Sequence, residues 1–174
     1  MDEVKFWEGC VMKVQIVDKD DNFIELKDRF EVDYDNDIYR VSALWLTNSE
    51  GKVLLAKRAM TKKYDPGMWG PAAVGTLEEN ETYESNIYKE AEEEIGLTGV
   101  NFDEMKKILV DDGHHYFIQW YKVVLNKDPS KFTLQQEEVD EVAWFDIDIV
   151  KKELSEMPDK YVPALPQIIR DLGL

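Results

Sequence analysis

The chain has 174 residues, of which 37 are Asp or Glu and 21 are Lys or Arg, giving a formal net charge of −16 at pH 7. This length suits one domain, and 44% hydrophobic residues suffice for a packed core, which excludes an intrinsically disordered chain. The acidic balance argues against binding to a nucleic acid polymer, because phosphate backbones are bound by clustered Lys and Arg. The single cysteine, Cys10, excludes a disulfide framework and a cysteine-based zinc site.

The N-terminal residues have neither the cationic start nor the apolar run of a signal peptide. No stretch of the chain approaches the ~18 apolar residues that a membrane-spanning helix needs. We therefore expect a cytoplasmic protein with no membrane partner, built as a single domain over residues 1–174.

The first elements in chain order are predicted to be strands. Residues 1–37 form an extension in which two short apolar runs, separated by the polar turn KDDN, predict a hairpin or a pair of edge strands. Residues 40–47 and 52–58 flank a four-residue turn that ends at Gly51, and they predict an antiparallel hairpin. A loop follows, and then a short apolar segment over residues 72–74.

The strongest helix signal runs from residue 81 to residue 95 and stops at Gly96. Further strands are predicted over residues 106–110, 115–125 and 139–147, and the tail from residue 150 alternates helical patterns with prolines. Strands that surround a central helix, with more helix at the end, predict an α/β fold with a mixed sheet between helices.

The predicted helix lies in an unusually acidic segment. Residues 75–97 contain eight glutamates and one lysine. Glu90, Glu93 and Glu94 are spaced i, i+3 and i+4, so they share one helix face, where like charges and the helix dipole both oppose them. A solvated acidic surface is the simplest interpretation, but this clustering favours a site for a hard divalent cation, Mg²⁺ or Mn²⁺. Ile87, Ala91 and Ile95 form a neighbouring apolar stripe that can pack on the sheet.

This segment resembles the Nudix box, whose pattern is G-x5-E-x7-R-E-U-x-E-E-x-G-U with U an aliphatic residue. The matching residues are Gly75, Glu81, Glu90, Ala91, Glu93, Glu94, Gly96 and Leu97. The departure is Lys89, which stands where the family has arginine. The preceding residues, 39–75, are similar to Nudix proteins close to the isopentenyl-diphosphate isomerase branch.

The resemblance implies an α/β/α sandwich with a central loop–helix–loop box at residues 75–97. It also implies metal-dependent hydrolysis of a nucleoside diphosphate linked to another group X. The implied metal-binding residues are Gly75, through its carbonyl, Glu90, Glu93, Glu94 and Glu137. The implied catalytic residues are Glu93, Glu94, Lys89 and Glu138. The general base is left open among the box carboxylates and the later pair Glu137 and Glu138, for which ordinary loop charge is an equal alternative.

A small phosphorylated substrate, a nucleotide derivative, is the expected partner, and a homodimer is possible. Lys57, Arg58 and Lys63 are candidates for phosphate contacts and Trp69 for stacking on a base, although a solvated strand end or a core aromatic would account for them equally well. Lys62 shares the loop of Lys63, and Tyr116 and Trp120 are further aromatic candidates. We interpret His114 and His115 as structural or surface residues.

Two other functions remain to be weighed. An isopentenyl-diphosphate isomerase of this family uses a cysteine in the strand leading into the box, but that strand reads GPAAVG here and Cys10 lies far upstream. A non-catalytic nucleotide-binding module usually loses the box carboxylates, whereas this chain keeps all three. Both observations favour hydrolysis.

Overall fold

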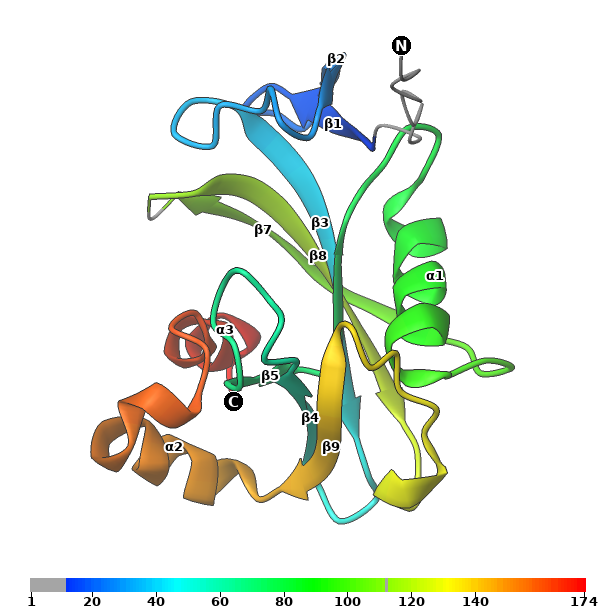
Figure 1. Ribbon diagram of the computed structural model, residues 1–174, viewed down its shortest axis with the longest axis vertical. Coiled ribbons are helices and arrows are strands. Elements are labelled where there is room, and N and C mark those ends of the chain that lie inside the picture. The colour runs from blue at the N-terminus through cyan, green and yellow to red at the C-terminus, as the bar shows by residue number, and fades with distance from the viewer. Residues whose placement is uncertain (1–11, 112) are drawn as a thin grey trace, which may run out of the picture.

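The computed structural model describes residues 12–111 and 113–174, and these form three layers. A mixed β-sheet lies in the middle, helix α1 covers one face, and helices α2 and α3 cover the other (Figure 1). This is the expected α/β/α sandwich. In the described ranges no helix is both long and apolar enough to span a membrane. Cys10 lies outside the described residues.

The strands are β1 (Lys13–Val17), β2 (Phe23–Asp28), β3 (Ile38–Thr47), β4 (Val53–Arg58), β5 (Trp69–Pro71), β6 (Ala73–Thr76), β7 (Asp103–Asp111), β8 (His115–Val124) and β9 (Val139–Phe145). The helices are α1 (Tyr83–Ile95), α2 (Ile147–Glu156) and α3 (Leu165–Leu172), with short 3-10 turns at Pro129–Lys131 and Pro158–Lys160.

Strand β3 organises the sheet because it has neighbours along both edges. On one edge β8 runs parallel to it from Tyr39↔Tyr116 to Thr47↔Val124. The other edge is shared in turn by β1, β6 and β4. The predicted hairpin of β3 and β4 exists, but it pairs only at Thr47↔Val53, because β6 takes the next positions on β3 while β4 pairs with β5 and β9. Strand β5 was not predicted, since three residues containing Gly and Pro give no strand pattern.

Helix α1 begins two residues later than predicted. The Thr82 side chain caps it by accepting a hydrogen bond from the backbone N–H of Ser85, and the Ser85 hydroxyl accepts from the N–H of Thr82. Glu81 therefore lies before the helix. The helix ends as predicted at Gly96, whose left-handed φ of 62° suits glycine.

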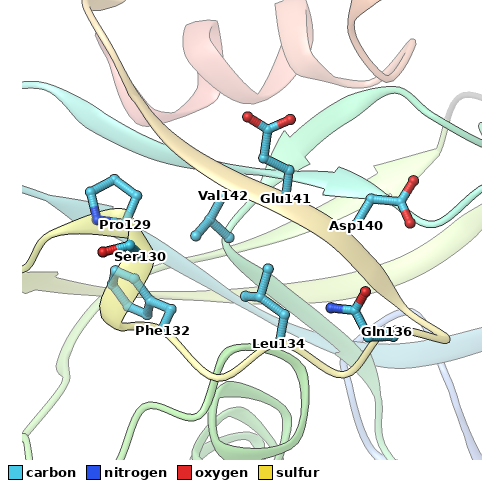
Figure 2. Close-up of a pocket in the computed structure, with 8 residues that line it drawn as sticks. All are labelled: Pro129, Ser130, Phe132, Leu134, Gln136, Asp140, Glu141 and Val142. Atoms are coloured by element: carbon cyan, nitrogen blue, oxygen red, sulfur yellow. The ribbon is translucent and has the colours of Figure 1, made fainter.

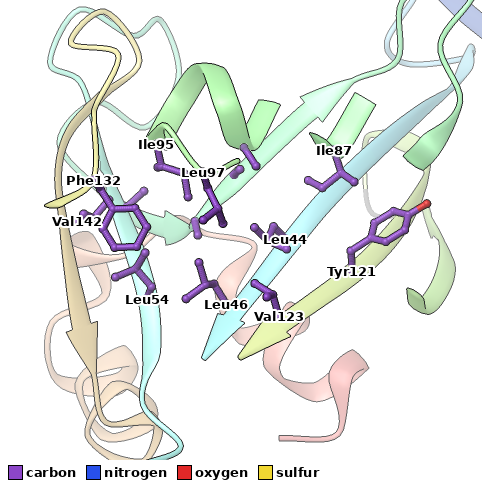
Figure 3. Close-up of a cluster of buried hydrophobic side chains, with 14 of the residues drawn as sticks. Leu44, Leu46, Leu54, Ile87, Ile95, Leu97, Tyr121, Val123, Phe132 and Val142 are labelled. Atoms are coloured by element: carbon purple, nitrogen blue, oxygen red, sulfur yellow. The ribbon is translucent and has the colours of Figure 1, made fainter. Parts of the chain in front are cut away.

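Two apolar cores hold the layers together, one on each face of the sheet. On the α1 face, the fully buried stripe Ile87, Ala91 and Ile95 packs against strand residues such as Leu44 and Leu54 (Figure 3). Each aliphatic side chain buried in this way contributes roughly 1.5–3 kcal/mol. Alternation along the strands assigns the next residues to the opposite face. That face is filled by Trp45, Leu55, Trp120, Tyr161, Leu165 and Ile169.

The N-terminal hairpin of β1 and β2 is attached to the loop that precedes α1. Val14 forms a β-bridge with Glu78. The buried Gln15 carboxamide donates to the carbonyl oxygens of Glu78 and Glu81 at 2.6 and 2.8 Å. At the hairpin turn, the Asp21 side chain accepts from residues of β3, α1 and β7; the donors are Arg40, Tyr83 and Lys107. The predicted extension is thus hydrogen-bonded to the acidic segment.

Candidate active site

The candidate site lies where α1 faces β6. Asn86, Glu90 and Glu94 are spaced four residues apart, so they form a polar line beside the apolar stripe of the same helix. A β-carbon at Gly75 would collide with Cγ and Cδ of Glu90, so only glycine allows this close approach. The Glu94 carboxylate accepts a hydrogen bond from the backbone N–H of Val74 at 3.2 Å. Both carboxylates therefore lie against β6.

The position of Glu90 and Glu94 makes their ionisation unfavourable. Burial raises the pKa of Glu90 to about 7; Lys89 opposes this shift and the negative charge of Glu93 adds to it. Burial, together with the nearby charge of Glu90, raises the pKa of Glu94 to about 8. Buried carboxylates that repel each other are stabilised in their ionised form by a cation between or beside them.

Lys89 connects the helix to the loop before it. Its Nζ lies 2.8 Å from Glu81 Oε1, 3.1 Å from Glu78 Oε1 and 3.7 Å from Glu90 Oε1. Burial acts to lower the pKa of Lys89, but the hydrogen bonds to Glu81 and Glu78 outweigh it and the pKa is raised. Burial likewise acts to raise the pKa of Glu81, and the hydrogen bonds from Lys89, Glu78 and Asn86 lower it overall. The lysine thus orients Glu81 and borders Glu90.

Two loops close the site at the C-terminal end of α1. The backbone N–H of Gln135 donates to the carbonyl oxygen of Glu94 at 3.1 Å, and the N–H of Ala59 donates to the carbonyl of Glu138 at 2.9 Å. The Lys62 ammonium forms an ion pair with the half-buried Glu138 carboxylate. Both charges influence the Glu94 carboxyl. Glu137 is exposed in the same segment, and Glu93 is exposed on the helix.

The predicted phosphate-binding residues are not all on this side of the sheet. Lys57 follows Val53 and Leu55 on alternate positions of β4, which assigns it to the face of α2 and α3. Arg58 is hydrogen-bonded to the loop that follows β4, because its Nε donates to the carbonyl oxygen of Tyr64 at 3.0 Å. Lys63 is exposed, with Nζ 5.0 Å from the centre of the Tyr64 ring.

The aromatic candidates mostly contribute to packing. The Trp69 ring lies 4.8 Å from that of Phe145 and belongs to the core on the α2 and α3 face. Trp120 is fully buried against Trp45. Tyr116 packs on Tyr39 with ring centres 5.4 Å apart.

The two histidines stand at the turn between β7 and β8. His115 Nδ1 lies 2.6 Å from the Asp111 carboxylate, and His114 is exposed. Among the described residues, neither histidine belongs to a group of three or more potential metal ligands.

A shallow pocket of about 430 Å³ lies between the 3-10 turn at Pro129–Lys131 and β9 (Figure 2). It is lined by Pro129, Ser130, Phe132, Leu134, Gln136, Asp140, Glu141 and Val142. Leu134 and Val142 line its apolar part, and the Glu141 carboxylate points away from Leu134 (Figure 2). None of the predicted site residues lines this pocket, so it is not the candidate site.

The donors around Gly75 fit a hard cation in their chemistry. Carboxylate and carbonyl oxygens are the ligands that Mg²⁺ and Mn²⁺ prefer. Burial raises the pKa values of Glu90 and Glu94, so added positive charge would stabilise their ionised forms. Within residues 12–111 and 113–174, no three His, Cys, Asp or Glu side chains are gathered as a finished metal-binding group.

Sequence reasoning missed the buried polar residues behind the carboxylates. Asn86 and Ser42 are fully buried, and the Asn86 amide donates to Glu81 Oε2 at 2.8 Å and to Glu90 Oε1 at 3.4 Å. One signal was available: Asn86 lies four residues before Glu90, and asparagine is unfavourable inside a helix unless its side chain has a partner. Gln15 gave no comparable signal, because its partners are more than 60 residues away.

Comparison with known proteins agrees with this geometry. The model of the NUDIX domain family matches residues 38–170. An uncharacterised Nudix hydrolase of Yersinia pestis is 30% identical over 155 residues, which cover 86% of this chain and 79% of that protein. A prenyl-diphosphate phosphatase of Methanosarcina mazei is 30% identical over 151 residues, 86% of this chain and 88% of that protein. An isopentenyl-diphosphate Delta-isomerase of Serratia proteamaculans is 24% identical over 163 residues, 91% and 89% of the two chains.

Solved structures share the fold at lower identity. A protein of Deinococcus radiodurans superposes with a TM-score of 0.81 at 16% identity, covering 92% of this chain and 98% of that one. The NUDIX domain of Shewanella oneidensis NrtR, in complex with ADP-ribose, has a TM-score of 0.54 at 17% identity and covers 65% and 75%. The family match over residues 38–170 and the relatives at 30% identity establish that the chain belongs to the Nudix family, as a Nudix hydrolase.

Proposed function

We propose that this hydrolase cleaves the diphosphate bond of a small phosphorylated substrate with the help of Mg²⁺, or of Mn²⁺ in its place. The observation that carries the proposal is the pair Glu90 and Glu94, two half-buried carboxyl groups with raised pKa values beside the glycine of β6. Glu90, Glu93, Glu94, the Gly75 carbonyl and Glu137 would hold the metal. When bound, such a cation offsets the negative charge of a diphosphate and lowers the barrier to attack at phosphorus.

The residues of the chain would then divide the work between positioning and proton transfer. Lys89 keeps Glu81 in place and contributes positive charge next to Glu90. Glu138 is our candidate for taking the proton of the attacking water, with Glu93 and Glu94 as alternatives. Lys62 fixes the direction of the Glu138 side chain through their ion pair. Lys63 and Arg58 would contact phosphate oxygens from the adjacent loop.

Two substrate classes deserve a direct test. A nucleoside diphosphate linked to another group is one, supported by the ADP-ribose complex of the Shewanella domain. An isoprenoid diphosphate is the other, supported by the Methanosarcina relative. The loop of residues 59–68 suits an amphipathic substrate, because the exposed apolar side chains Met60 and Tyr64 lie on either side of Lys62 and Lys63. Lys57 and Trp69, on the other face of the sheet, are the weakest of our substrate candidates.

The experiment is a hydrolysis assay with the purified chain, with and without Mg²⁺, in which the phosphorylated products and any free phosphate are separated by anion-exchange chromatography and quantified. The substrates are ADP-ribose and other nucleoside diphosphate sugars, dinucleoside polyphosphates, free nucleotides, and isopentenyl and geranyl diphosphate. We expect metal-dependent cleavage of the diphosphate bond in one class of substrate and no cleavage by the Glu94→Gln variant. An isomerase would instead convert isopentenyl diphosphate without releasing phosphate, and a binding module would do neither, so either result contradicts the proposal.

A further inference from the structure

The buried Asn86 amide is oriented by its neighbours on three sides. Its Nδ2 has two hydrogens, which are shared among three acceptors: Glu81 Oε2 at 2.8 Å, the Thr76 carbonyl oxygen at 3.3 Å and Glu90 Oε1 at 3.4 Å. Its Oδ1 accepts from the Ser42 hydroxyl. Carboxylates and carbonyls only accept hydrogen bonds, so the NH₂ group must face them and the oxygen must face the one donor. Ser42 therefore fixes which way the amide points.

Asn86 also limits where the Glu90 side chain can lie. The backbone of Gly75 lies against Cγ and Cδ of Glu90 on one side, and Asn86 meets Oε1 of the same side chain. Lys89, 3.7 Å from Oε1, completes this environment. Because the carboxylate is enclosed by a backbone, an amide and an ammonium group, its rotamer is set before any ligand arrives.

A purely structural role would be a poor explanation for an amide at this position. The neighbouring helix residues that face the sheet are Ile87 and Ala91. An apolar side chain at residue 86 could be buried in the same way, without the free-energy cost of removing a polar group from water. The amide is fully buried and has all its partners, of which two are carboxylates of the acidic segment. Its placement is therefore explained by what it does to those carboxylates.

We propose that Asn86, oriented by Ser42, is a positioning residue that holds Glu90 and Glu81 ready for the divalent cation. The inference rests on the proposed function, because it assigns Glu90 to the metal. Groups that hydrogen-bond to metal ligands typically change metal affinity by 10- to 100-fold when they are removed. Ser42 acts on the cation only through Asn86.

The test measures Mn²⁺ binding to the substrate-free chain, from the loss of the free-Mn²⁺ signal in electron paramagnetic resonance. We expect Asn86→Leu, of similar volume, to weaken Mn²⁺ binding about tenfold. Ser42→Ala should weaken it less, and adding Ser42→Ala to Asn86→Leu should have no further effect, because the amide through which Ser42 acts is already gone. The matched control is Gln119→Leu, which removes another buried amide, one that donates to the Trp120 carbonyl and touches no carboxylate.

Each outcome decides between two explanations. Equal weakening by Asn86→Leu and Gln119→Leu, or effects of Ser42→Ala and Asn86→Leu that simply add, would overturn the positioning role while leaving metal-dependent hydrolysis intact. If Asn86→Leu fails to fold, Asn86→Ser retains a small polar side chain that cannot span both carboxylates, and the same loss of affinity is expected. A parent chain that binds no Mn²⁺ and cleaves none of the diphosphate substrates would refute the proposed function and this inference together.

Discussion

The two faces of the sheet are built from the same strands but bury different kinds of side chain. The face of α2 and α3 is packed with aromatic and aliphatic side chains, among them Trp45, Trp120 and Leu165. The α1 face carries an apolar stripe too, but beside it lie the buried polar side chains of Ser42 and Asn86 and the two carboxyl groups. Burying polar groups is costly unless every one has a partner. Ser42 and Asn86 bear this cost on the face that holds the site, and they hydrogen-bond to each other and to the acidic segment.

The largest expected effect is the loss of hydrolysis when a carboxylate of helix α1 is replaced. Glu94→Gln and Glu93→Gln should each lower the hydrolysis rate by on the order of 10²-fold or more, because a metal ligand or base is lost. Without metal, the two should differ in stability. Glu94→Gln should raise the melting temperature above pH 8, since it removes a carboxylate whose ionisation is opposed by burial. Glu93→Gln should raise it less, because Glu93 is exposed and acts only by repelling Glu90. Near-full turnover of either variant would remove that residue from the catalytic set.

Substitutions in the core on the α2 and α3 face should lower stability strongly and change turnover little. Leu165→Ala removes a fully buried side chain from the core on the α2 and α3 face and should cost roughly 2–5 kcal/mol of unfolding free energy. The turnover of the folded molecules should stay within about twofold of the parent. Urea unfolding and a rate measurement at low temperature test this. Ile169→Val, with an expected cost of about 0.5–1.5 kcal/mol, serves if the first variant does not fold. A large drop in turnover at unchanged folded fraction would show that the faces are coupled.

The pH dependence of stability should come from the site. In the unfolded chain Glu90 and Glu94 have pKa values near 4.5, and the fold raises them to about 7 and 8. The folded state thus binds more protons between these limits, so unfolding free energy should fall by several kcal/mol as pH rises from about 5 to 8. Denaturation in EDTA at several pH values measures it. Saturating Mg²⁺, or the double change Glu90→Gln with Glu94→Gln, should flatten the profile, and an equally steep profile in that variant would contradict this origin.

The smallest expected effect concerns the departure from the family pattern. Lys89→Arg should change turnover little, because the ammonium already reaches Glu81 and Glu78 and neighbouring side chains fit its slimmer head group. Lys89→Ala should lower turnover by about tenfold, since Glu81 loses its cation. Steady-state rates across a range of Mg²⁺ concentrations separate the two. If Lys89→Ala has the same turnover as the parent at every Mg²⁺ concentration, Lys89 is an ordinary surface lysine with no role in the site.

The sequence was sufficient for the layers, for the box helix and for the carboxylates on it. Periodicity identified the stripe of Ile87, Ala91 and Ile95, and the left-handed Gly96 ended the helix where expected. The start of helix α1 was predicted two residues too early. The capping hydrogen bonds between Thr82 and Ser85 make Tyr83 the first helical residue, so Glu81 lies before the helix. Local patterns of this kind can be read from the chain because partners lie within four residues of one another.

The remainder depends on contacts that join distant parts of the chain. An i,i+4 contact from Lys89 to Glu93 was available along the helix, yet the ammonium pairs with Glu81 and Glu78 in the preceding loop. Lys62 meets Glu138 across 76 residues. Strand alternation, which is visible only once the pairing is known, separates Lys57 from the carboxylates. Reasoning from one sequence cannot predict such pairings, because no local pattern in the chain identifies the distant partner.

The hairpin bound to the loop before α1 has a consequence for how this chain can be divided. The family match begins at residue 38, whereas the hydrogen bonds that hold residues 78–81 begin at Gln15. A chain cut at the family boundary would leave two loop carbonyls without their donor and Arg40 without the Asp21 carboxylate. A change at residue 15 or 21 should therefore act across this boundary, on the loop of residues 78–81 or on Arg40 of the matched segment.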